Sequence, residues 1–385
     1  MGDLSMEPLA IYIHWPFCRS ICPYCHFNRY VAPELDWTLW ENSFLKEIAY
    51  WGKRVGPKVI KSIFLGGGTP SLMKPDLVAR LIKAVSDTWV TPKGIEITLE
   101  MNPTDVEHVR AFQNAGINRI SMGIQSFTQS TLSLLGRIHT VEHIHHALEQ
   151  VKNSQLSYSF DLIYGHTLHT HADQWAQDLT QALPWITNHI SLYELSYEQG
   201  TPFYHKRHHI LEDERLLELE EITHTLLTPL GLERYEISNY ATPKAQSQHN
   251  LMYWTYQDFL GLGPGAHGRI TEQGKKVATQ AHRLPRHWIS SLSEKDNGLA
   301  IDHPLSREER LQEHLLMGLR LQKGLQVQEL FLPQEKGCPL FYERIKHCQD
   351  QGLILPSHLA LTSKGRNVLN SIVTYLCSLP IVKSV

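Results

Sequence analysis

Apolar segments with the length of strands alternate with segments of helical periodicity between residues 10 and 229. This alternation predicts a repeated βα unit. The predicted strands are 10–14, 61–68, 95–100, 118–127, 158–165 and 189–196. The predicted helices are 35–51, 76–89, 105–116, 140–153, 172–183 and 211–229. Six such units build a parallel α/β sheet, open or curled into a barrel, with functional groups at the carboxyl ends of its strands.

The βα repeat stops after residue 230, and a further unit is expected to begin at Ser306. Ser306 and Glu309 form a capping box ahead of an amphipathic helix that we expect to end at Gly324. The apolar stripe of this helix is Leu311, Leu315 and Leu319. Residues 352–373 are expected to form a strand, a turn and a helix. We therefore expect three regions: a core at 1–235, an irregular region at 236–305 and a small C-terminal domain at 306–385.

Charge and hydropathy exclude several classes of function. The net charge of −3 provides no basic field for nucleic acid, so we expect no nucleic-acid partner. No apolar run of about 18 residues is present, so we expect no membrane span. The first ten residues lack the basic flank and apolar core of a secretion signal. These features together predict a cytoplasmic protein.

The segment FCRSICPYCHFNRY, residues 17–30, holds Cys18, Cys22 and Cys25 in the spacing C-x3-C-x2-C. Clustered thiols in a reducing compartment usually bind metal or do redox work. A structural zinc site needs four closed ligands, and no second cysteine pair supplies them. A cubane iron–sulfur cluster with one iron free of protein ligands fits better. The scattered cysteines are expected to play no part in it: Cys338, Cys348 and Cys377.

This motif, placed directly after the first strand of a βα repeat, resembles the radical S-adenosylmethionine (SAM) superfamily. The resemblance implies a partial (β/α)6 barrel and a [4Fe–4S] cluster whose open iron binds the amino and carboxylate groups of SAM. It also implies an electron donor of the flavodoxin or ferredoxin kind, and reductive cleavage of SAM to a 5′-deoxyadenosyl radical. Tyr24 and Phe27 correspond to aromatics around the cluster and adenine. FLGGGTPSLM, residues 64–73, is similar to the segment that meets the amino group of SAM.

The chain is most similar to one branch, the oxygen-independent coproporphyrinogen III oxidases and the HemW-type haem chaperones. The similarity runs from IYIHWPFC through GGGTP, GIQSF, LGRIH, YELSYEQGTPFY and HNLMYW to GLGPGAHG, and it implies a winged-helix-like α+β C-terminal domain. The residues that resemble SAM contacts are Tyr12, Gly67, Gly68, Thr69, Glu100, Gln125, Arg137 and Asp161. Glu100, Gln125 and Asp161 are expected at or just beyond strand ends, where polar groups can bind an ammonium or ribose hydroxyls.

Phe27 separates the two members of this branch. The oxidases carry a further cysteine two residues after the third, and this chain has Phe27 there, which resembles the HemW type. A second HemW-type mark is the motif HNLMYW, with His249, Asn250, Tyr253 and Trp254. Imidazole is a common ligand of haem iron, and aromatic rings pack on porphyrin faces. The resemblance therefore implies haem binding and transfer to an unknown acceptor protein.

Two other activities stay open at this point. The first is radical oxidative decarboxylation of coproporphyrinogen III, and the second is radical modification of another target such as RNA, which the slightly negative charge disfavours. The chain also departs from the HemW pattern after DLIYG, where a stretch that usually reads Leu-Pro-Gly-Gln-Thr contains His166 and His169 here. These two histidines are alternative candidates for the haem ligand.

Overall fold

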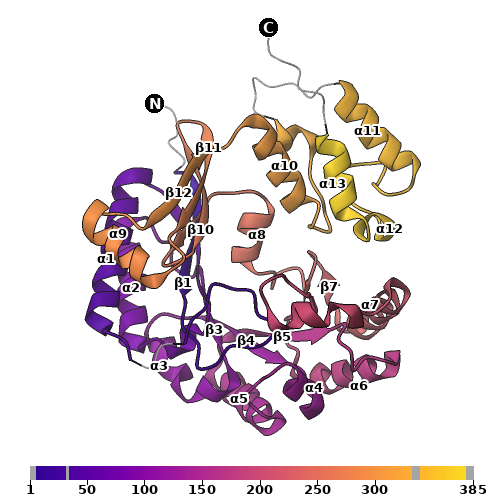
Figure 1. Cartoon of the computed structure of the whole chain (residues 1–385), viewed down its shortest axis with the longest axis horizontal. Coiled ribbons are helices and arrows are strands. Elements are labelled where there is room, and N and C mark those ends of the chain that lie inside the picture. Colours follow the sequence, from indigo (N-terminus) through magenta and orange to yellow (C-terminus); the bar gives the residue numbers. More distant parts are fainter. Residues whose placement is uncertain (1–5, 32–33, 332–338, 379–385) are drawn as a thin grey trace.

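The computed structural model of the protein describes residues 6–31, 34–331 and 339–378, without the side chains of 207–209 (Figure 1). Cys338 lies outside the described residues. The strands of this part of the chain form one twelve-stranded sheet in the order β12-β11-β10-β9-β1-β2-β3-β4-β5-β6-β8-β7. Because the strands at the two ends of this order do not pair with each other, the barrel is open.

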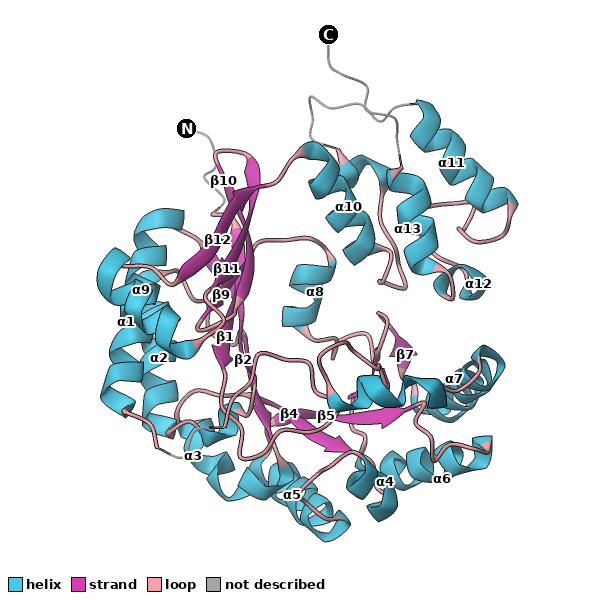
Figure 2. Cartoon of the chain, viewed as in Figure 1, coloured by secondary structure: helices cyan, strands magenta, loops and turns pink. Residues whose placement is uncertain are grey.

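Six parallel strands form the middle of the sheet in sequence order, as predicted. They are β1 (Pro8–Trp15), β2 (Val59–Gly67), β3 (Glu96–Met101), β4 (Arg119–Gln125), β5 (Ser157–Tyr164) and β6 (His189–Glu194). Right-handed crossovers between strands in consecutive order bring every connecting helix to the same face. Figure 2 shows these helices along the outside of the curved sheet. The α/β partial barrel expected from the sequence is confirmed.

The outer helices bury one apolar face each against the sheet. They are α1 (Trp37–Val55), α2 (Pro75–Thr88), α3 (Val109–Asn114), α5 (Val141–Ser154), α6 (Ala172–Ala182) and α7 (Asp213–Leu227). In α1 the buried positions include Trp40, Phe44, Ile48 and Trp51, which recur every three or four residues as the sequence predicts. The short helix α4 (Gln129–Leu134), between β4 and α5, was not predicted, because its six residues carry too little periodicity.

The expectation of an irregular region at 236–305 is wrong. This region contributes β8 (Asn239–Ala241), α8 (Gln248–Trp254), β9 (Phe259–Leu262), β10 (His267–Glu272), β11 (Lys275–Ala281), α9 (Pro285–Lys295) and β12 (Leu299–Pro304). β9 pairs in parallel with β1, and β10 to β12 extend that edge antiparallel. At the other edge β8 and β7 (Glu233–Arg234) pair antiparallel next to β6. The strands were missed because β8 and β9 are short and β10 to β12 carry many polar residues.

The C-terminal residues form a helical unit with an apolar core of its own. Its helices are α10 (Arg307–Gly318), α11 (Pro339–Asp350), α12 (Ser363–Arg366) and α13 (Leu369–Cys377). The capping box at Ser306 is present, but α10 ends at Gly318 and not at Gly324. In place of the strand expected near residue 354, the structure has the isolated bridges Ile354↔Leu361 and Leu325↔Leu359. The domain boundaries and the winged-helix comparison stay predictions.

Glu313 and His314 on α10 contact β10 and the segment that precedes β9. The Arg269 guanidinium on β10 donates to both carboxylate oxygens of Glu313, at 2.8 and 2.6 Å. Tyr256 stacks on His314 with ring centroids 4.8 Å apart, and its hydroxyl donates to Glu313 at 2.9 Å. A paired, half-buried carboxylate of this kind fixes orientation better than an exposed ion pair does.

The region after residue 236 shares its core with the barrel. Trp288 on α9 is fully buried against Trp40 and Phe44 of α1. Its indole N–H donates to Glu47 at 3.0 Å, and the N–H of Gly263 donates to the same carboxyl at 2.7 Å. Burial raises the pKa of Glu47 to about 7. The sheet extension therefore packs on the first helix of the repeat.

We expect Trp288→Ala to lower the free energy of unfolding by about 3–5 kcal/mol, because it removes a large buried ring and leaves the Glu47 carboxyl short of a donor. Denaturant unfolding of the purified protein measures this loss. Arg286→Ala, an exposed position on the same helix, is the control. A loss no larger in Trp288→Ala than in the control would show that α9 contributes little to the barrel core.

Candidate functional site

Two adjoining cavities lie on the face of the sheet that the outer helices leave uncovered. The smaller, of about 310 Å³, contains the three clustered cysteines and is called the cluster cavity. The larger, of about 690 Å³, contains His249 and is called the barrel cavity. Seven residues line both: His26, Phe27, Gly67, Glu100, Ser121, Asp161 and Tyr193. Ligands in the two cavities would therefore be neighbours.

The cysteine loop follows β1 and is held against it by backbone hydrogen bonds. Tyr30 N–H donates to Pro16 C=O at 2.7 Å, and Cys18 N–H donates to Tyr30 C=O at 2.9 Å. Further along, Cys25 N–H donates to Cys22 C=O at 3.2 Å. The three cysteines are half-buried and line the cluster cavity together, as the sequence predicts.

The thiols interact with one another. Burial raises the pKa of Cys18, and negative charge on Cys25 and Cys22 raises it further. Within the described residues, no three His, Cys, Asp or Glu side chains converge as ligands of one metal ion. The irons of a cubane lie at separate corners, so its cysteines need not converge on one point. This donor set fits a [4Fe–4S] cluster better than a single zinc ion.

Glycines allow the end of β2 to lie directly against the cysteine loop. Gly68 N–H donates to Trp15 C=O at 2.7 Å, and Thr69 N–H donates to Phe17 C=O at 2.8 Å. A Cβ on Gly68 would lie 2.7 Å from the carbonyl oxygen of Phe17, and Gly67 has a φ of +111°. The glycines are therefore required by this close approach. Gly67, Gly68 and Thr69 all line the cluster cavity.

Two buried carboxyl groups stand in the wall between the cavities. Burial, reinforced by the charge of Asp161, raises the pKa of Glu100 to about 8. Burial likewise raises the pKa of Asp161 to about 6, although Arg119 and Arg137 oppose the shift. The Oδ1 atom of Asp161 has no hydrogen-bond partner in the part of the chain that the structure describes. A cation placed here would stabilise both carboxylates.

Asp161 is not at a strand end, where the sequence analysis put it. It is the fifth of eight residues in β5 and faces the cavities from the middle of the strand. The predicted strand, 158–165, agrees with β5 to within one residue and already had Asp161 in its interior, so the error lay in placing this residue at the strand end. Gln125 is the last residue of β4, as expected, and its φ of +79° turns the chain there.

Arg137 holds the far wall of the cluster cavity. Its guanidinium donates to Asn102 Oδ1 at 2.5 Å and to Gly123 C=O at 2.9 Å, and it lies 3.4 Å from Cys22 Sγ. Tyr24 lines the same wall, with its ring 6.4 Å from that of Phe203. The positive charge of Arg137 therefore lies beside the sulfur of a predicted cluster ligand.

His249 lies in the barrel cavity on α8, a two-turn helix on the inner side of the sheet (Figure 2). Its Nδ1 is 3.0 Å from Ser62 Oγ, and in the described residues Nε2 makes no hydrogen bond. Its ring stacks on Phe64, with centroids 5.0 Å apart, and meets Tyr12 and Tyr253 at 6.2 Å each. Burial lowers the pKa of His249 to about 3, so the imidazole is neutral at physiological pH.

Four predicted candidates lie away from the cavity expected for them. Tyr12 lines the barrel cavity rather than the cluster cavity, and its hydroxyl lies 3.0 Å from His14 Nδ1. Trp254 lines neither cavity, and its ring lies 5.7 Å from the guanidinium of Arg320. His166 and His169 are buried with ring centroids 3.7 Å apart and line neither cavity, so they are poorly placed as ligands.

Several lining residues were not predicted. They are Ser121, Ser159, Ser191, Tyr193, Arg119, His189 and Asn239. Many occupy alternate positions on predicted strands, such as 191 and 193 on β6. Because side chains alternate between the two faces of a strand, one known cavity-facing residue would have predicted these others. Asn250 and Tyr253 line the barrel cavity as expected, and Phe27 lines both cavities with 55% of its surface exposed.

Comparisons with known proteins agree with this geometry. The radical SAM superfamily model matches residues 12–180. Radical S-adenosyl methionine domain-containing protein 1, mitochondrial, of Bos taurus is 35% identical, over 96% of this chain and 87% of its own length. Heme chaperone HemW of Escherichia coli is 37% identical, over 74% of this chain and 77% of its own.

The chain belongs to the radical SAM superfamily, in the HemW branch. Membership implies the [4Fe–4S] cluster and SAM as cofactors. Among solved structures, coproporphyrinogen III oxidase HemN of Escherichia coli has a TM-score of 0.80 at 20% identity, covering 97% of this chain and 91% of that one. This similarity supports the fold alone.

In the part of the chain that the structure describes, no helix is both long and apolar enough to span a membrane. The cytoplasmic location stays a prediction, and the animal relatives carry the word mitochondrial in their names.

Replacing Cys18, Cys22 or Cys25 by Ala should abolish stable cluster binding, because two thiolates hold a cubane poorly. Anaerobically reconstituted wild type should contain about four irons per chain, as a [4Fe–4S] cluster requires. Iron and sulfide analysis makes the comparison. Cys348→Ala is the matched control, since this buried thiol belongs to the C-terminal core. Full iron content in all three single variants would contradict the assignment.

SAM binding should release protons near pH 7. The raised pKa of Glu100, about 8, leaves its carboxyl largely protonated without ligand, and a neighbouring sulfonium or ammonium favours the carboxylate. Affinity should therefore rise as pH increases from about 6 to about 8. Calorimetric titration in buffers of different ionisation enthalpy measures the proton release.

Glu100→Gln should abolish most of this proton release. It should also weaken SAM binding by about 1.5–3 kcal/mol, or roughly ten- to a hundredfold, as expected for a lost hydrogen bond to a charged group. Unchanged affinity and unchanged proton release in Glu100→Gln would place the cationic end of SAM elsewhere.

Proposed function

We propose that this protein is a haem chaperone. It binds haem in the barrel cavity, next to the cluster and SAM, and passes the haem to an acceptor protein. The observation that carries the proposal is the neutral imidazole of His249, whose Nε2 has no hydrogen-bond partner among the described residues, in a cavity of about 690 Å³. Cavities of this size accommodate cofactor-sized ligands.

The residues around His249 fit a flat, largely apolar macrocycle. Tyr12, Phe64, Tyr253 and Phe259 contribute rings to the lining near His249, and Ser159, Ser191, Asn239 and Asn250 contribute polar groups elsewhere in it. Burying the apolar face of a porphyrin against these rings contributes roughly 25 cal/mol per Å². When bound, haem supplies a metal that can exchange between protein ligands. The names of the HemW relatives support the same ligand.

Phe27 stands at the junction of the two cavities, more than half exposed. An apolar ring there offers a surface to a ligand and no fourth thiol, which favours binding over oxidase chemistry. The cluster needs an electron donor, for which we propose a small protein of the flavodoxin or ferredoxin kind. The haem acceptor is a second partner, defined here only as a protein that takes haem.

Haem binding and oxidase activity can be separated in one preparation. Anaerobically reconstituted protein with SAM and reductant is tested for haem binding by its Soret band and for conversion of coproporphyrinogen III by product analysis. We expect haem binding and no decarboxylation. Decarboxylation without haem binding would contradict the chaperone proposal and support the oxidase alternative, since that enzyme holds an iron-free substrate.

We expect His249→Ala to weaken haem binding and shift the Soret band, because it removes the proposed iron ligand, while leaving the iron–sulfur content unchanged. Optical titration with haem measures both effects. His314→Ala is the matched control: this histidine is also buried, but it stacks on Tyr256 outside both cavities. Identical titrations for wild type and His249→Ala would exclude His249 as the ligand.

A further inference from the structure

Two side chains on adjacent strands hold His249. Ser62 on β2 and Glu96 on β3 are paired in the parallel register, so both side chains leave the sheet on the cavity face. We propose that Ser62 and Glu96 are positioning residues that fix the imidazole of His249, so that its Nε2 is directed at a metal-bearing macrocycle. This inference rests on the proposed function and adds to it the groups that set the ligand's geometry.

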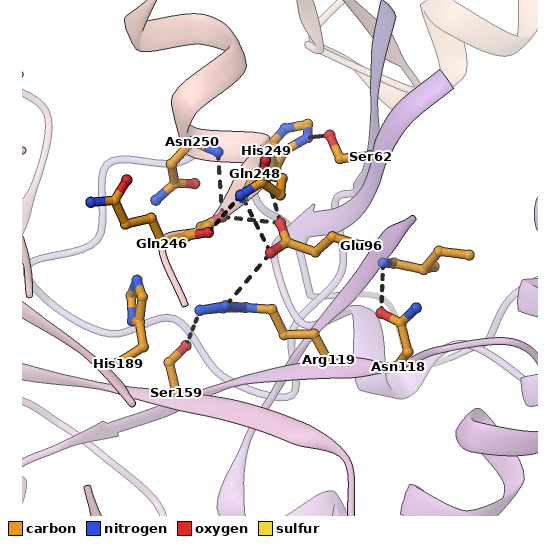
Figure 3. Close-up of polar contacts among 12 residues, drawn as sticks. Ser62, Glu96, Asn118, Arg119, Ser159, His189, Gln246, Gln248, His249 and Asn250 are labelled. Atoms are coloured by element: carbon orange, nitrogen blue, oxygen red, sulfur yellow. Dashed lines mark hydrogen bonds and ion pairs between the residues drawn. The ribbon is translucent and has the colours of Figure 1, made fainter. Parts of the chain in front are cut away.

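Glu96 anchors the start of α8 (Figure 3). Its carboxylate accepts the N–H groups of Gln248 and His249 at 3.2 and 3.0 Å, and the hydroxyl of Ser247 at 3.1 Å. Ser247 accepts the N–H groups of Asn250 and of the residue after it, at 3.3 and 3.0 Å. All four N–H groups of the first turn are therefore satisfied.

The anchor decides where His249 lies, because α8 is too short to be stable by itself. A helix of seven residues is marginal in water and depends on tertiary contacts. Among its residues only His249 is buried. The backbone N–H of this one residue is bound by Glu96, and its side chain is bound by Ser62. Backbone and ring are thus held independently.

Arg119 balances the charge of the anchor. Its guanidinium lies 3.7 Å from Glu96 and donates to Ser159 at 2.8 Å, and its side chain is almost fully buried (Figure 3). A buried carboxylate persists only with a paired cation and hydrogen-bond donors, and Glu96 has both. A buried ion pair therefore lies beneath a two-turn helix. Well-packed apolar residues at these positions would stabilise the fold at least as well, so stability alone does not explain the pair.

Ser62 acts on the ring. Metal-binding histidines usually donate the N–H of the second ring nitrogen to a neighbouring group, which fixes the tautomer and the ring orientation. With Nδ1–H donated to the Ser62 oxygen, the lone pair of Nε2 is available to a metal. We assign this orienting role to Ser62. Removing its hydroxyl should affect the imidazole ring of His249 and leave the hydrogen bonds from Glu96 to α8 in place.

The experiment compares three substitutions in cluster-loaded protein. Ser62→Ala removes the hydroxyl, Ser62→Thr retains it, and Thr98→Val is the control. Thr98 is fully buried on the same face of β3, two residues after Glu96, and its hydroxyl has no partner within the described part of the chain. Transfer of haem to excess apomyoglobin gives the release rate, and nitrogen-15 NMR of the haem-free protein gives the His249 tautomer, assigned by its absence in His249→Gln.

We expect Ser62→Ala to accelerate haem release by roughly ten- to a hundredfold, the usual effect of losing a group that orients a metal ligand, and to change the tautomer signal. Ser62→Thr and Thr98→Val should match wild type in both measurements. Glu96→Gln should accelerate release and also speed amide exchange at Gln248 and His249.

If Ser62→Ala matches wild type in release and tautomer while His249→Ala alters haem binding, the positioning role is wrong and the proposed function stands. If His249→Ala also leaves haem binding unchanged, the ligand assignment fails, and the positioning role fails with it. If Glu96→Gln does not fold, the comparison of Ser62→Ala with Ser62→Thr tests the positioning role by itself.

Discussion

The central position of β1 in the sheet is the constraint on which the rest of the structure depends. This strand pairs in parallel with β2 along residues 8–15 and with β9 along residues 10–13. Its carboxyl end leads into the cysteine loop, and its cavity face presents Tyr12 and His14. One strand therefore fixes the cluster loop, the first wall of the barrel cavity and the attachment of the region after residue 236.

Buried charged side chains lie on the face of the sheet that lines the cavities. The opposite face packs against the outer helices and is apolar. Glu96, Glu100 and Asp161 are partly compensated by Arg119 and Arg137. Glu96 accepts three hydrogen bonds from the start of α8, whereas burial raises the pKa of the other two carboxyls. Uncompensated buried carboxyls are costly in a folded protein and are found where a ligand of opposite charge completes the site. The wall between the cavities therefore suits a cationic ligand on the cluster side.

Much of the fold follows from local patterns. The six βα units, the helix face of α1 and the cap at Ser306 depend on residues close together in sequence, and each was predictable. The cysteine spacing pointed to a cluster for the same reason. The strands after residue 236 were not predictable, because they are short or rich in polar residues and depend on pairing between distant segments, such as β9 with β1 and β8 with β6.

The parts of the site that the sequence could not predict are contacts between distant residues. Glu96 and His249 are separated by more than 150 positions, and the first looks like an ordinary strand residue until the fold brings α8 onto it. Conversely, Trp254 belongs to the same motif as His249 but faces the C-terminal unit, because five positions along a helix turn a side chain away from its neighbour. The sequence motif thus identifies the protein family more securely than it predicts which of its side chains line the cavity.

We infer that one open barrel holds a cluster and a haem in adjoining cavities. Pulsed electron paramagnetic resonance tests it in protein that carries the reduced cluster and nitrosyl-ferrous haem, both of which are paramagnetic. We expect the fast-relaxing cluster to enhance the relaxation of the haem signal, and this enhancement to be lost in His249→Ala. A haem signal that a stoichiometric reduced cluster leaves unaffected would place the haem outside the barrel cavity and contradict the claim.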